Sequence, residues 1–91
     1  MIRQRTSGDT TELTFVLPKD EPSGKVSVVG DFNDWTPGVH TLAKRSNGTR
    51  SVKVAVPAGA TYQFRYLAED GHWFDDPEHE HRAEDNGVIH A

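Results

Sequence analysis

The chain has no cysteine among its 91 residues. It therefore forms no disulfide and offers no thiolate to a metal, so its fold depends on packing alone, as in most cytosolic domains. It also lacks a run of ~18 apolar residues, the length of a membrane span, and no apolar segment follows the basic N-terminus. We therefore expect a cytoplasmic protein that needs no membrane.

Basic charge is scarce. The formal net charge is −4, whereas nucleic-acid-binding surfaces usually carry a basic stripe, so we expect no nucleic-acid partner. Residues 51–91 contain eight acidic residues against three basic ones, and all eight lie between Glu69 and Asp85. The acidity therefore belongs to one segment of the chain.

Helical periodicity is missing as well. Apolar residues instead alternate with a period of two in segments 13–17, 52–56 and 62–66, which is typical of strands with one buried face. Shorter segments of the same kind occur at 26–28 and at 88–90, and we expect the latter to be a closing edge strand. The pattern predicts an all-β fold, a small antiparallel β-sandwich.

The length suits one domain over residues 1–91, because a chain of this size builds a single core. Its first ten residues are polar, and we expect a mobile arm or a short strand there. Asn47 and Gly48 tolerate the positive φ angles of a tight hairpin and predict one between two strands.

Two tryptophans stand at polar turns. Trp35 ends the segment Val28-Val29-Gly30-Asp31-Phe32-Asn33-Asp34-Trp35, and Trp73 follows the turn Glu69-Asp70-Gly71. Tryptophan is costly to leave in water, so such a position has a packing or a ligand reason. Two interpretations stay open, an anchor in the core of the sandwich or an exposed surface for a flat apolar ligand.

The motif ending in Trp35, together with Tyr62-Gln63-Phe64-Arg65-Tyr66 and Asp70-Gly71-His72-Trp73-Phe74-Asp75-Asp76-Pro77, resembles carbohydrate-binding module family 48. That family includes the early-set immunoglobulin-like domain at the N-terminus of isoamylases and glycogen branching enzymes. It also includes the glycogen-binding domain of the AMP-activated protein kinase β subunit. The resemblance covers roughly residues 12–90 and implies an immunoglobulin-like (early-set) β-sandwich that binds α-1,4-glucan and is not an enzyme.

The resemblance also implies a binding site. By their places in the family motifs, Trp35 and Trp73 would stack on glucose rings, while Arg65 and Asn86 would hydrogen-bond to sugar hydroxyls. The residue chemistry agrees with this assignment, because the C–H face of a pyranose lies flat on an aromatic ring and its hydroxyls need planar or forked partners. For Arg65, an outward side chain paired with a nearby acid is an equal alternative.

The alternatives to a sugar-binding module are a metal site, a glycosidase and a protein-docking module. His79 and His81 would point to the same side of an extended segment and suit a divalent metal, but such spacing is common in solvated acidic loops, so we expect no metal or other cofactor. Asp75 and Asp76 are adjacent, and adjacent strand residues point apart, so they do not flank a substrate as glycosidase carboxylates do.

The remaining alternative is a module of the same fold that docks on a glycogen-metabolising enzyme or a kinase-like partner without binding sugar.

Overall fold

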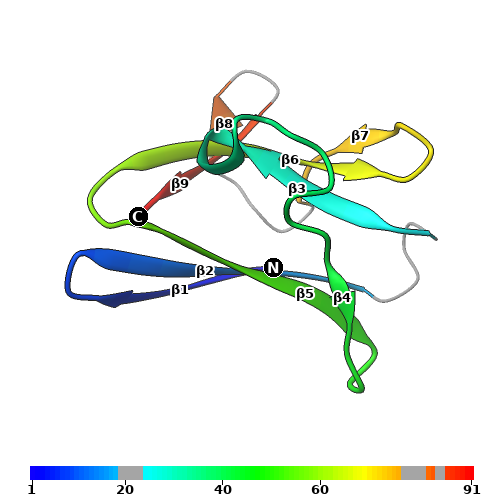
Figure 1. Ribbon diagram of the computed structural model, residues 1–91, viewed down its shortest axis with the longest axis horizontal. Helices are drawn as coiled ribbons and strands as arrows, with labels where there is room; N and C mark the ends of the chain where they lie inside the picture. Colours follow the sequence, from blue (N-terminus) through cyan, green and yellow to red (C-terminus); the bar gives the residue numbers. More distant parts are fainter. Residues whose placement is uncertain (19–23, 77–81, 84–85) are drawn as a thin grey trace.

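The computed structural model describes residues 1–18, 24–76, 82–83 and 86–91. These residues form two antiparallel β-sheets that pack face to face (Figure 1). The first sheet has the order β1 (Ile2–Ser7), β2 (Thr10–Pro18), β5 (Thr49–Pro57), β4 (Ala43–Lys44). The second has the order β3 (Val26–Gly30), β6 (Thr61–Ala68), β9 (Asn86–His90), β8 (Arg82–Ala83), and β7 (Trp73–Phe74) also pairs with β6.

This strand order is that of an immunoglobulin constant-type sandwich. In such a domain strands A, B, E and D form one sheet, and C, F and G form the other. Here β1, β2, β5 and β4 take the first set of places, and β3, β6 and β9 take the second. The predicted antiparallel β-sandwich is therefore confirmed.

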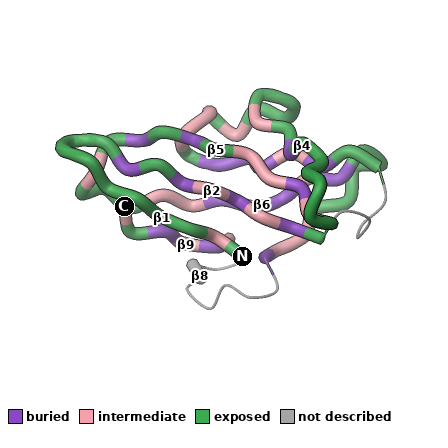
Figure 2. The backbone as a smooth tube through the Cα atoms, turned by 90° about the horizontal axis from the view of Figure 1, so that it is seen from below, coloured by how far each residue is buried: buried purple, intermediate pink, exposed green. Residues whose placement is uncertain are grey.

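The core lies between the two sheets and follows the alternation of the sequence (Figure 2). In β2 every second side chain from Thr11 to Leu17 is buried, and in β6 the same holds for Phe64, Tyr66 and Ala68. Phe15 is central, because its ring lies 5.3 Å from that of Phe64 and 6.3 Å from that of Tyr66. The neighbours of these residues in β6 point to the outer face, where the candidate site lies.

The hairpin predicted at Asn47 and Gly48 joins β4 to β5. Gly48 has a φ of 80°, and the backbone N–H of Arg45 donates to the carbonyl of Thr49 at 2.8 Å. The Asn47 side chain closes the turn, because its Oδ1 accepts from the Thr49 hydroxyl at 2.6 Å.

Both ends of the described chain belong to the sheets. Ile2–Ser7 pair with β2 over their full length, so this segment is a strand and not a free arm. The closing strand expected at 88–90 is present as part of β9, which begins earlier, at Asn86. Residues 87–90 pair with β6, and β8 pairs only with Asn86 and Gly87. β8 ends the strand order of the second sheet. With two residues it is too short to show an alternation of apolar and polar residues in the sequence. In the described residues, no helix is long and apolar enough to cross a membrane.

Candidate carbohydrate-binding groove

The turn that follows β3 is built from the middle of the Trp35 motif. Gly30 cannot be replaced without movement, because a Cβ there would collide with the backbone carbonyl of Gln63 and approach the Phe32 ring. Asn33 holds the turn closed, since its Oδ1 accepts from the N–H of Gly30 at 3.1 Å and its Nδ2 donates to the carbonyl of Val28 at 3.0 Å. Most of this motif therefore has a structural role.

Trp35 leaves this turn toward the outer face of the second sheet. Its backbone has a φ of 53°, which is uncommon outside glycine, and its N–H donates to the carbonyl of Gly30 at 3.0 Å. The indole Nε1–H donates to Oδ1 of Asp31 at 3.1 Å, and Oδ2 of Asp31 accepts the backbone N–H of Gln63 at 2.8 Å. The ring is partly buried, and Asp31 connects it to strand β6.

Strand β6 carries Arg65 on the same outer face. The Arg65 Nε lies 3.3 Å from Oδ1 of Asp75, and both side chains are 25% exposed. The Nε–H is not aligned with that oxygen for a hydrogen bond, so the contact is a charge pair. Arg65 therefore combines both interpretations of the sequence: it is paired with an acid, and it still faces the outer surface.

The next acid along the chain points the other way. Asp76 is 3% exposed, and its Oδ2 accepts the hydroxyl of Tyr66 at 2.8 Å. Asp75 and Asp76 thus lie on opposite sides of the sheet, as the extended backbone predicts. They do not face each other across a common space.

The other two predicted residues come from neighbouring strands. Trp73 in β7 lies opposite Leu67 of β6 and is 40% exposed. Asn86 begins β9, and its Nδ2 donates to Oε1 of Gln63 at 2.9 Å. Neither Trp35 nor Trp73 belongs to the buried core cluster of the described residues.

These four side chains meet at one place. An open groove of about 360 Å³ is lined by Trp35, Arg65, Trp73 and Asn86, which come from the turn after β3 and from β6, β7 and β9. It presents two aromatic rings beside a guanidinium and an amide. Such a surface suits a ligand with an apolar face and several hydroxyls at its rim.

Three further residues support the groove and were missed in the sequence. Asp31, Gln63 and Asp75 each hold a groove side chain, through the contacts given above. Gln63 could have been predicted, because it lies two residues from Arg65 in an alternating segment and therefore points to the same outer face. An acid beside Arg65 was expected without being identified as Asp75, and the bond from Asp31 to the backbone of Gln63 joins residues 32 positions apart, which no local pattern indicates.

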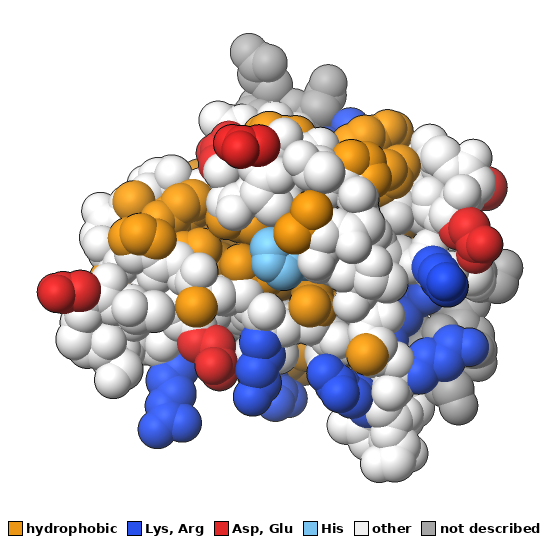
Figure 3. All heavy atoms as spheres, in the orientation of Figure 1, with side chains coloured by type: hydrophobic (Ala, Val, Ile, Leu, Met, Phe, Trp, Pro, Cys, Tyr) orange, Lys and Arg blue, Asp and Glu red, His pale blue; other side chains and the backbone are white. Residues whose placement is uncertain are grey.

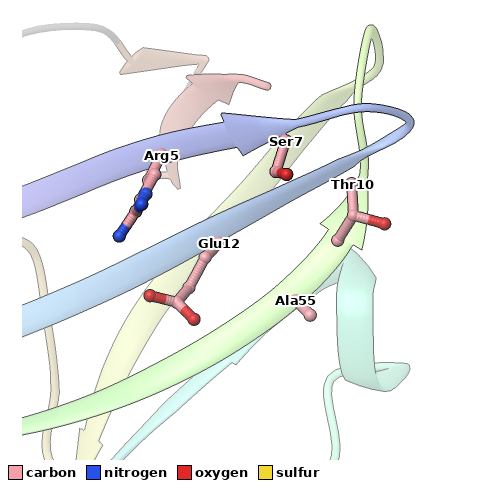
Figure 4. A pocket seen from close by; sticks show the side chains of 5 residues that line it. All are labelled: Arg5, Ser7, Thr10, Glu12 and Ala55. Carbon is pink, nitrogen blue, oxygen red and sulfur yellow. The ribbon is translucent and has the colours of Figure 1, made fainter.

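A second hollow lies on the outer face of the first sheet. It has a volume of about 250 Å³ and is lined by Arg5, Ser7, Thr10, Glu12 and Ala55 (Figure 4). Lysine and arginine side chains gather along this side of the molecule (Figure 3). Among the described residues that line this hollow none is aromatic, so they offer no surface on which a sugar ring would stack and are useful as controls.

The metal alternative concerns two histidines of the acidic segment. His79 and His81 lie outside the described residues. Within the described ranges, no group of three or more histidine, aspartate or glutamate side chains is arranged to hold a metal ion.

Comparison with known proteins finds similarity to 1,4-alpha-glucan branching enzymes over part of the chain. No family model matches it. It is 38% identical over 56 residues to a 1,4-alpha-glucan branching enzyme of Synechococcus elongatus, and 42% identical over 48 residues to one of Xanthomonas campestris. The matches cover 59% and 52% of this chain but only 7% of each enzyme. The chain is thus weakly related to a small segment of glucan branching enzymes.

Proposed function

We propose that this protein is a non-catalytic module that binds α-1,4-linked glucan, such as glycogen or a starch-like polymer, in the groove between Trp35 and Trp73. The observation that carries the proposal is the convergence of four residues. The resemblance selected them one by one from separate parts of the sequence, and they line a single groove on one face of the sandwich.

The chemistry of the groove supports a neutral sugar polymer. The exposed ring of Trp73 offers a flat apolar surface to a pyranose, and Arg65 and Asn86 offer donors to its hydroxyls. The charge of Arg65 is balanced by Asp75, so the groove is not built around a free cation that would select an anionic ligand. The related segment belongs to enzymes named for 1,4-alpha-glucan, which agrees with this ligand class.

The arrangement of Asp75 and Asp76 supports a binding role without catalysis. Glycoside hydrolysis uses two carboxyl groups about 5–9 Å apart on opposite sides of the scissile bond. Asp75 is paired with Arg65, and Asp76 is buried against Tyr66. Neither arrangement leaves a pair of acids facing a common substrate.

Affinity electrophoresis tests the proposal. The protein should migrate more slowly in a native gel that contains glycogen than in a gel without it. Calorimetry with maltoheptaose should then give a Kd of about 10 μM to 1 mM, because a shallow groove with few hydrogen bonds yields roughly 4–7 kcal/mol.

A matched pair of variants makes the test specific. Arg65→Ala should reduce the retardation, whereas Arg5→Ala on the opposite sheet should not. Unchanged migration of the parent protein in glycogen, with no heat at several millimolar maltoheptaose, would overturn the proposal and favour a protein-docking module.

A further inference from the structure

We propose that Asp31 is a positioning residue, which holds the Trp35 ring in place for the ligand before binding. This inference rests on the proposed function and deepens it. Asp31 uses both carboxylate oxygens: one accepts the Trp35 indole N–H at 3.1 Å, and the other accepts the backbone N–H of Gln63 at 2.8 Å.

The bond between Asp31 and the backbone of Gln63 fixes Trp35 relative to the other groove residues. Gln63 is two residues from Arg65 on β6, and its side chain accepts the Nδ2–H of Asn86 at 2.9 Å. Asp31 thereby connects Trp35 to the same piece of strand that positions Arg65 and Asn86. The relative placement of three groove side chains, which lie on different elements, depends on this connection.

The bond between Asp31 and the indole, called the tether below, holds a ring that the core does not hold. Asp34 and Trp35 both have φ values of 53°, and the ring of Trp35 lies outside the core cluster. The core therefore does not determine the orientation of the ring. A ring that is held in its bound orientation loses less conformational freedom when the ligand arrives, which increases affinity.

Replacing Asp31 with asparagine tests the tether. An amide has only one acceptor oxygen, so one of the two N–H donors must face the NH2 group instead. Asp31→Asn should weaken maltoheptaose binding by up to about tenfold, because the released ring must then be ordered when the ligand binds, and ordering one side chain has a cost of that size.

Asp34→Asn is the matched control. It removes the same charge from the same turn, and asparagine tolerates the positive φ at this position. In Asp34 the backbone carbonyl, and not the carboxylate, accepts the Thr36 hydroxyl. Its affinity should stay within about twofold of the parent, because an exposed charge contributes little.

A double-mutant cycle separates the tether from a general structural effect. Trp35→Phe keeps a ring but has no indole N–H. In this background Asp31→Asn should change binding by no more than about twofold, because the interaction being removed is already absent. An equal loss in both backgrounds would overturn the proposal, since Asp31 would then act only through Gln63.

A second measurement needs no glucan. In the Trp73→Phe background Trp35 is the only tryptophan, and Asp31→Asn should increase its quenching by acrylamide while Asp34→Asn leaves it unchanged. If the parent does not bind glucan but the quenching rises, the proposed function fails and the tether stands. Unchanged quenching and unchanged affinity in a parent that binds glucan would refute the tether alone.

Discussion

Replacing Trp73 with alanine distinguishes a ligand platform from a core anchor. The side chain is 40% exposed and lies outside the buried core cluster. Loss of one stacking ring should weaken glucan binding by about 1–3 kcal/mol, the scale of aromatic stacking on nucleic-acid bases. That corresponds to roughly a 5- to 150-fold increase in Kd.

The folding cost of Trp73→Ala should be much smaller than that of a core truncation. Because much of the ring is already in contact with water, we expect about 1 kcal/mol, or a fall in Tm of about 4–8 °C for a domain of this size. Phe64→Ala is the control. Its side chain is 1% exposed and contacts Phe15 and Tyr66, so its loss should cost about 3–5 kcal/mol of a total stability of about 5–15 kcal/mol.

The two effects are measured on the same samples. Calorimetry with maltoheptaose gives the affinity, and thermal unfolding followed by circular dichroism gives the Tm. If Trp73→Ala lowers the Tm as much as Phe64→Ala does, Trp73 is a structural anchor. If it binds maltoheptaose like the parent, the ring is not part of the binding surface.

Two further substitutions test the groove and the turn that supports it. Arg65→Ala should weaken glucan binding by about 0.5–1.5 kcal/mol, less than Trp73→Ala, because water replaces a lost hydroxyl contact more easily than a stacked ring. Its Tm should move by no more than a few degrees; a larger fall would mean that the pair with Asp75 serves mainly stability. Gly30→Ala should lower the free energy of unfolding by about 1–3 kcal/mol, because its Cβ has no space beside the carbonyl of Gln63. Urea denaturation measures this loss, and an unchanged midpoint would show that the turn can yield.

The sequence predicted the sheets more completely than it predicted the groove. The alternation at 13–17, 52–56 and 62–66 predicted which side chains face the core, because a strand with one solvated face must place its apolar residues on every second position. Val52 and Tyr62 face it as well but are only partly buried. Asn47 and Gly48 predicted the β4–β5 hairpin for an equally local reason, the positive φ at Gly48. These features depend on residues close together in the chain.

Some buried groups could not be predicted from such patterns. Arg50 is 1% exposed, although arginine is rarely buried, and its Nη1 donates to the carbonyl of Gly24 at 2.6 Å. The acceptor lies 26 residues away, in a segment that does not precede or follow β5 directly. Composition and periodicity contain no information on such a pairing.

The groove likewise combines features that follow from local patterns with contacts between distant residues. The resemblance of the motifs to a known family singled out Trp35, Arg65, Trp73 and Asn86, and the alternation in β6 placed Arg65 on the outer face. Their convergence depends on the register of β6 with its neighbours and on the bonds of Asp31 and Gln63, which join parts of the chain more than 20 residues apart. By itself the sequence determined the alternating strands and the hairpin turn, because these follow from local geometry, and the resemblance of its motifs to a known family supplied the candidate side chains. Only the tertiary structure decided which of these side chains share a surface, because strand pairing and packing bring distant residues together.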